Sequence, residues 1–114
     1  MRVMKRALFH QNVRETIKMF PSEVRKELGK AIWDLQEGHT LGMPLSRPMS
    51  SVAAGAHELR VRDQSGIYRT FYYAKSQLGI LVFHAFQKKT QKTPMEEIEL
   101  GRKRLKEMLY EEKR

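Results

Sequence analysis

The stretch HELRVRDQSGIYRTFYY, residues 57–73, decides the fold, because it reads as two strands joined by a turn. In HELRVRD, apolar and charged residues alternate with the period of two that is typical of a β-strand. Leu59 and Val61 therefore fall on one face of this strand. The charged side chains fall on the other face: Glu58, Arg60 and Arg62.

The turn signals DQSG and SQLG divide the middle of the chain into three strands. DQSG leads into IYRTFYY, which is dense in aromatic and β-branched residues, and SQLG leads into ILVFHAF. Such residues are enriched in strands, and short polar turns containing glycine join sequential strands as hairpins. The pattern predicts a three-stranded antiparallel meander.

The chain before the meander predicts one short strand and two helices. RVMKRALFHQ, residues 2–11, reads as the strand, with Val3 and Ala7–Phe9 as its apolar content. Asn12 followed by Glu15 is a candidate capping box for a short helix. From Pro21 to the stop signal Gly38, a second helix is indicated by an apolar stripe of helical period: Val24, Leu28, Ala31, Ile32 and Leu35.

Residues 39–56 contain two glycines and two prolines with little periodicity, which predicts a loop with room for a short edge segment. After the meander, Thr93, Pro94 and Glu96 form a second candidate capping box. The final helix that it opens has one apolar stripe: Ile98, Leu105, Met108 and Leu109.

This order of elements predicts an α+β fold in a single domain covering residues 1–114. We expect an N-terminal strand, two helices packed on a curved antiparallel sheet, and a C-terminal helix. The helices should cover one face of the sheet. The charged residues of the first meander strand would then lie on the uncovered face, where cations avoid the cost of unpaired burial.

Positive charge is concentrated in the meander and the loop after it. The whole chain has a formal net charge of +9. Residues 60–92 contain seven basic residues and one acidic residue, Asp63, whereas basic and acidic residues alternate in the final helix. A patch of this density predicts a polyanionic partner, with phosphate as the obvious group, and charge that serves only solubility is the alternative.

Several classes of protein are disfavoured. Cysteine is absent, which excludes disulfide and zinc-ribbon scaffolds, and only two aspartates are present, too few for a carboxylate cluster that holds catalytic Mg²⁺. The sequence also has no apolar stretch long enough for a signal peptide or a membrane span. We therefore expect a cytoplasmic protein without a metal or another cofactor.

The series ELRVRDQSGIYRTFYY and ILVFHAFQKKTQKTPMEEIELGRKRL, taken with the order of elements, resembles the RelE/ParE toxin superfamily, most closely its HigB-like, phage-derived-type branch. The resemblance covers about residues 3–110. It implies a toxin of a type II toxin–antitoxin module, and many such toxins cut mRNA, often on the ribosome. It also implies a helix-turn-helix antitoxin as partner, with operator DNA bound only through the antitoxin complex.

The resemblance implies roles for individual residues. Arg69 matches the arginine that binds the scissile phosphate, and Arg60 lies at a neighbouring active-site position. The other candidate catalytic residues are Glu58, His84, Lys88 and Lys89, and candidate RNA-binding residues are Arg62, Lys92, Tyr68 and Tyr72. For four of these positions a structural role is an open alternative. Glu58 would then be a cross-strand ion pair, His84 a core histidine, and the tyrosines sheet packing.

Cleavage of RNA without a metal requires few groups. The 2′-hydroxyl attacks the adjacent phosphorus while the enzyme aligns the two, moves two protons and stabilises added charge on the phosphate oxygens. Arg69 suits those oxygens because its planar guanidinium binds two of them at once. Glu58 or a lysine would act as base, and Lys88, Lys89 or His84 as acid. Two alternatives of the same fold are a ParE-like gyrase inhibitor and a non-catalytic nucleic-acid-binding protein.

Overall fold

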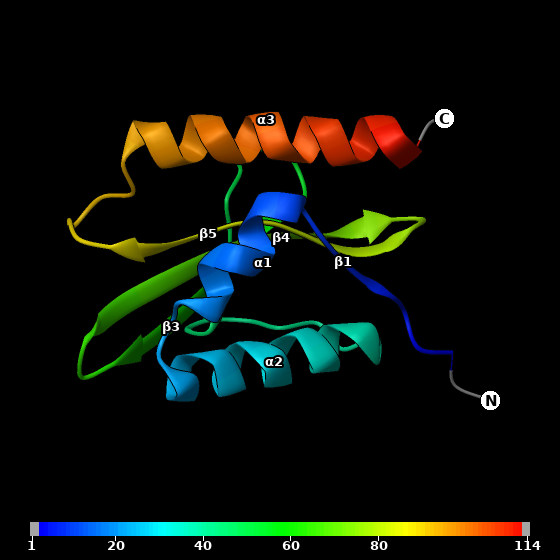
Figure 1. Cartoon of the computed structure of the whole chain (residues 1–114). Coiled ribbons are helices and arrows are strands. Elements are labelled where there is room, and N and C mark those ends of the chain that lie inside the picture. The colour runs from blue at the N-terminus through cyan, green and yellow to red at the C-terminus, as the bar shows by residue number, and fades with distance from the viewer. Residues whose placement is uncertain (1–2, 113–114) are drawn as a thin grey trace.

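The computed structural model describes residues 3–112, in which three helices pack on a five-stranded sheet (Figure 1). The fold is α+β and RelE-like, as the sequence predicts. In chain order the elements are β1 Ala7–Phe9, α1 Gln11–Lys18, α2 Ser22–Gln36, β2 Ser46–Pro48, β3 Ala56–Asp63, β4 Gly66–Ser76, β5 Gly79–Lys88 and α3 Met95–Glu112.

The predicted meander forms the centre of the sheet. The strand order is β1-β5-β4-β3-β2, and β3, β4 and β5 pair in antiparallel fashion. The edge segment expected within residues 39–56 is β2, which pairs antiparallel with β3. The first strand pairs parallel with β5 and is shorter than the predicted residues 2–11, of which Arg2 lies outside the described residues.

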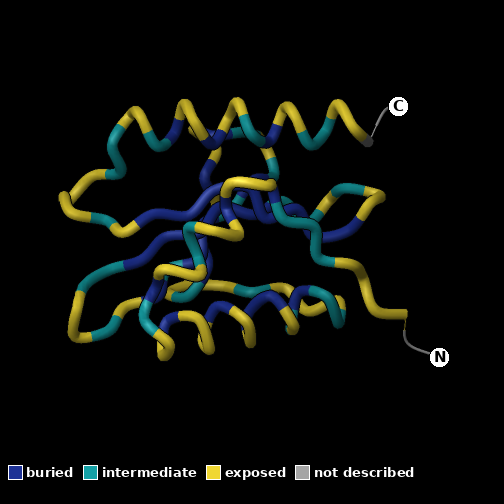
Figure 2. The backbone as a smooth tube through the Cα atoms, viewed as in Figure 1, coloured by how far each residue is buried: buried dark blue, intermediate teal, exposed yellow. Residues whose placement is uncertain are grey.

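The prediction that all helices cover one face of the sheet is wrong. Helices α1 and α2 pack on one face, and α3 packs on the opposite face, so the buried strands lie between two helical layers (Figures 1 and 2). The two faces have separate cores. Leu59, Tyr68 and Val82 belong to the core under α1 and α2, whereas Phe71 and Phe83 belong to the core under α3.

The apolar character of β5 on both faces explains this arrangement. Its segment from Gly79 to Phe86 is buried throughout, as is usual for a strand that is covered on both sides. A second apolar face that large must be buried by another element, and the stripe of α3 covers it. Gly101 allows the helix to come close, because a Cβ at this position would lie 2.8 Å from Cδ2 of Phe71.

Both predicted capping boxes are wrong in detail. Helix α1 begins at Gln11, and His10 is its N-cap, since Nδ1 of His10 accepts a hydrogen bond from the Asn12 backbone N–H at 3.3 Å. Before α3, the Thr93 hydroxyl has no hydrogen-bond partner among the described residues, so it does not cap the helix. The helix instead begins at Met95 with backbone bonds to the Pro94 carbonyl.

The three described helices include none with the length and apolar character needed to cross a bilayer.

Candidate phosphate-binding site

A cleft of about 1000 Å³ lies on the α3 side of the sheet, between the β3–β4 strands, the loop after β2 and the loop between β5 and α3. The turn that joins β3 to β4 and the loop between β5 and α3 extend from the same side of the molecule (Figure 1). Every charged residue that lines the cleft, among those described, is basic. These residues, called the cationic cleft below, are Arg47, Arg60, Arg62, Arg69, Lys88, Lys89 and Lys92.

Strand alternation and register bring the strand residues of the cationic cleft together. Arg60 pairs directly with Arg69 across β3 and β4, and Ile67, two residues before Arg69, pairs with Lys88 on β5. Because side chains two apart on a strand share a face, Arg62 joins the same group. The structure therefore gathers six predicted residues on one surface: Arg60, Arg62, Arg69, Lys88, Lys89 and Lys92.

Arg69 is at the base of the cleft, with only 4% of its surface exposed. Burial lowers the pKa of Arg69, the Glu58 carboxylate opposes this shift, and the neighbouring arginines reinforce it. Its Nε has no hydrogen-bond partner among the described residues. A buried guanidinium among other cations is a site at which an anion gains strong, poorly screened interactions.

Glu58 lies beneath the cleft and is fully buried. Arg47 Nε donates a hydrogen bond to Glu58 Oε1 at 2.9 Å, and Arg69 Nε lies 3.8 Å from the same oxygen. Glu58 thus forms the ion pair that the sequence left as an alternative to a catalytic base. This carboxylate holds two arginines, and it does not line the cleft.

Arg47 is a cleft residue that the sequence reading missed. It belongs to β2, within the segment predicted to be a loop, and it pairs with Glu58 in the β2–β3 register. One signal was present in the sequence. A glutamate on the face of a strand that carries two arginines needs a partner when it is buried, and an arginine on an adjacent edge segment supplies one.

Lys88 is at the end of β5, where the sheet meets the cleft. Partial burial lowers the pKa of Lys88, and the positive charge of Arg69 lowers it further, while Glu58 opposes both effects. A lysine with a lowered pKa has a larger neutral fraction near neutral pH, and only the neutral amine accepts a proton.

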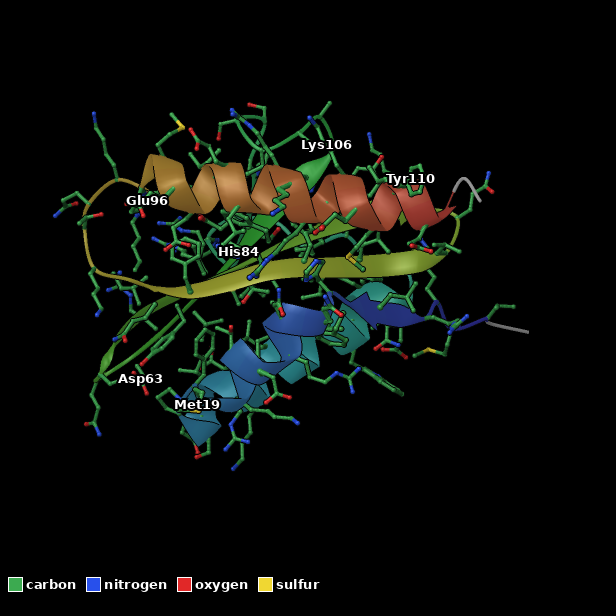
Figure 3. The ribbon with its side chains drawn as sticks, turned by 45° about the horizontal axis from the view of Figure 1, so that its top comes forward. Met19, Asp63, His84, Glu96, Lys106 and Tyr110 are labelled. Carbon is green, nitrogen blue, oxygen red and sulfur yellow. The ribbon has the colours of Figure 1, made fainter. Side chains whose placement is uncertain are left out.

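His84 lies outside the cleft, under α3 (Figure 3). A register shift in β5 turns both Phe83 and His84 toward this helix. Arg104 Nη1 donates to His84 Nδ1 at 2.9 Å, which leaves the proton on Nε2, and Nε2–H donates to Glu97 at 2.7 Å. His84 is therefore a satisfied core histidine, and the hypothesis that it is the catalytic acid is corrected.

Tyr68 and Tyr72 lie in the core on the opposite face of the sheet. The Tyr68 ring packs on Phe20 with centroids 4.7 Å apart, and its hydroxyl shares a hydrogen bond with Ser65 at 2.7 Å. The Tyr72 hydroxyl shares a hydrogen bond with the Ser46 hydroxyl at 2.6 Å. Neither ring lines the cleft, so the expectation that one of them stacks on an RNA base is corrected in favour of sheet packing.

Residues 15–106 match the family described as phage derived protein Gp49-like (DUF891). The chain belongs to this Gp49-like family. The match spans every residue of the cationic cleft, from Arg47 to Lys92. Gp49-like proteins are a RelE-type, toxin-like family, which agrees with the coarser part of the resemblance. No curated protein matches the chain.

Proposed function

We propose that this Gp49-like protein is the toxin of a type II toxin–antitoxin module and cleaves mRNA without a metal. One observation carries the proposal: the cationic cleft has seven basic residues, of which Arg69 is buried at its base, and no acidic lining residue among those described. A phosphodiester is the anion that such a set of donors suits best. The toxin-like family supports the biological setting.

In this mechanism the phosphate sits over Arg69 and Arg60, which bind its non-bridging oxygens. The 2′-oxygen of the preceding ribose forms a bond to phosphorus as the bond from phosphorus to the 5′-oxygen breaks. The products are a 2′,3′-cyclic phosphate and a 5′-hydroxyl. Negative charge grows on the two non-bridging oxygens in the transition state, and fixed guanidinium donors stabilise that charge without reorganising.

The two proton transfers fall to lysines of the cleft. Neutral Lys88 accepts the proton of the attacking 2′-hydroxyl, consistent with its lowered pKa. The ammonium group of Lys89, the next residue of the same cleft, gives a proton to the leaving 5′-oxygen. Glu58 and His84 take no part in proton transfer in this scheme, since both are buried and neither lines the cleft.

The proposed partners follow from the HigB-like resemblance. They are mRNA, engaged on the ribosome, and a small helix-turn-helix antitoxin encoded beside the toxin. The antitoxin would cover the toxin and bind operator DNA as a complex. The cationic cleft is the surface that would receive RNA.

The decisive experiment incubates the purified protein with a single-stranded RNA in EDTA and, in a parallel reaction, with mRNA on intact ribosomes in the Mg²⁺ that ribosomes require. We expect cleavage that gives a 2′,3′-cyclic phosphate and that fails when the attacking ribose is 2′-deoxy. Arg69→Gln should remove cleavage. The control is Lys26→Gln, which removes one positive charge from an exposed position of α2.

Other outcomes separate the alternatives of the same fold. Salt-dependent RNA binding without cleavage under any condition would identify a non-catalytic nucleic-acid-binding protein. Growth arrest with DNA damage and intact mRNA would identify a gyrase inhibitor. Either result would overturn the nuclease proposal.

A further inference from the structure

A second hollow, of about 380 Å³, opens beside the cationic cleft and shares part of its lining. Four residues line both spaces, so the two adjoin there: Arg60, Arg62, Ile67 and Arg69. The rest of the hollow is mostly apolar and is formed by Pro44, Leu45 and Val61.

The hollow exists because β2 covers only part of the edge of β3. The β2–β3 register ends at Ser46 opposite Leu59, and the Arg60 N–H then donates to the Leu45 carbonyl at 2.7 Å. The chain before Leu45 no longer pairs with β3, which leaves the edge beside Arg62 uncovered. This site is therefore a gap at a sheet edge, with one wall from the chain before β2 and one from the β3–β4 strands.

The walls of the hollow are fixed by packing. Leu45 packs against the core under α1 and α2, and Val61 is a buried member of that core. Ile67 is half-buried and pairs with Arg62 on one side and Lys88 on the other. A ligand that enters the hollow consequently meets a preformed surface, with apolar groups and arginine side chains together.

We propose that this hollow is a base-binding subsite, which takes the nucleobase adjacent to the phosphate held in the cationic cleft. This inference rests on the proposed function, because it needs RNA as the ligand. Unpaired bases bind proteins by stacking on apolar side chains and on guanidinium planes, and both are present here. The volume falls in the ~300–1,000 Å³ range of pockets that hold small organic ligands. A bare phosphate gains nothing from the apolar wall, so the hollow should distinguish a nucleotide from its backbone.

The test measures binding of the whole purified chain to a fluorescent tetranucleotide in which every ribose is 2′-O-methylated, so that cleavage cannot occur. Four further probes each replace one base with an abasic site. We expect one abasic position to weaken binding roughly tenfold or more, the scale of one lost base stack, while the other positions change it little. Ile67→Thr, which keeps a β-branched side chain in the strand, should weaken binding of the intact probe by a similar factor.

The same variant gives a sharper criterion. In Ile67→Thr, replacing the critical base with an abasic site should weaken binding little further, because the apolar contact of that base with Ile67 is already lost. Leu78→Thr is the control, since Leu78 is an exposed apolar residue in the β4–β5 turn and lines neither space. Pro44→Ser tests the opposite wall from outside the strands, should Ile67→Thr fail to fold.

The outcomes separate the subsite from the proposed function. If every abasic probe binds as well as the intact one, the subsite is overturned while phosphate binding stands. Equal weakening of intact and abasic probes by Ile67→Thr also overturns it. If the intact tetranucleotide does not bind while the protein still cleaves mRNA on ribosomes, the subsite fails and the proposed function stands; if neither binding nor cleavage is seen, both fail.

Discussion

Arg60 and Arg69 pair directly across β3 and β4, so two positive charges oppose each other at the base of the cationic cleft. Like charges at directly opposed strand positions are destabilising. The Nε atoms of both arginines are buried without a hydrogen-bond partner among the described residues. A sheet selected for stability alone would not place them so, and their position is consistent with a binding function that costs stability.

Arg60→Thr should therefore raise the stability of the fold while it weakens RNA binding. Relief of the repulsion should increase the free energy of unfolding by about 0.5 kcal/mol. Urea denaturation at low ionic strength measures this gain, which should shrink at high salt. Arg62→Thr is the matched control, because its cross-strand neighbour is the uncharged Ile67. An equal gain in both variants would exclude the pairwise repulsion as its source.

Glu58→Gln should destabilise the protein, because the buried carboxylate holds Arg47 and Arg69. Removing one partner of a buried ion pair costs about 3 kcal/mol, which urea denaturation resolves. Cleavage per folded molecule should fall far less than the ~10²–10⁴-fold expected for loss of a catalytic base. The exposed Glu99→Gln in α3 serves as control. A stable Glu58→Gln protein without activity would restore the base hypothesis for Glu58.

The pH dependence of cleavage should report Lys88. Because its pKa is lowered from the ordinary lysine value, the rate should rise with pH and level off below about pH 10.5. Lys88→Arg should remove this rising limb, since arginine stays protonated throughout the range. Lys75→Arg, at an exposed position of β4, should keep it. A rate that falls as pH rises would indicate that the decisive lysine acts as an acid.

His84 should make stability depend on pH. Burial lowers its pKa, Glu97 opposes the shift and Arg104 adds to it, so the unfolded chain binds a proton before the folded one as pH falls. The contribution of neutral His84 to the free energy of unfolding is complete above the unfolded pKa of about 6.5, and it is lost as pH falls through the lower pKa of the folded state. Urea denaturation at about pH 7 and about pH 5 should show this loss, and His84→Gln should reduce it. The exposed His39→Gln should behave as the parent protein does; the same pH slope in His84→Gln would contradict the assignment.

Two glycines in helices should respond to alanine with opposite signs. Alanine at Gly29, with no heavy atom within 4 Å of its new Cβ, should stabilise α2 by about 0.5–1 kcal/mol. At Gly101 the Cβ would lie 2.8 Å from the Phe71 ring, and overpacking of about 1–3 kcal/mol should outweigh the same helical gain. Thermal or urea denaturation decides the signs. Stabilisation by Gly101→Ala would show that α3 shifts away from the sheet at little cost.

The meander and the cleft could be read from the sequence because both depend on local patterns. Alternation in residues 57–63 placed Arg60 and Arg62 on one face, and the turn signals set the register that brings Arg69 beside them. The face covered by α3 could not be read in this way, because it depends on long-range packing of a strand that is apolar on both sides. His84 shows the same limit. Whether it faces the cleft or α3 is decided by a register shift in β5 that leaves no local signature.

Arg47 and the two tyrosines show a second limit. Arg47 enters the cleft only because a three-residue edge strand pairs with β3, and so short a strand carries almost no periodicity. Tyr68 and Arg69 are neighbours in the sequence but point to opposite faces of the sheet. An aromatic residue directly next to a functional arginine on a strand therefore lies outside the site of that arginine.

The parallel pairing of β1 with β5 also sets when the molecule can mature during its synthesis. Among the described strands, β1 is synthesised before its partner β5 and stays unpaired until β5 emerges, and Lys88 and Lys89 emerge only with or after β5. Pairing between such distant segments forms late, after loop closure over most of the chain. A nascent chain that stops short of Gly79 lacks both β5, the partner of β1, and the lysines of the cationic cleft. Synthesis must therefore have passed β5 and Lys89 before a competent molecule exists.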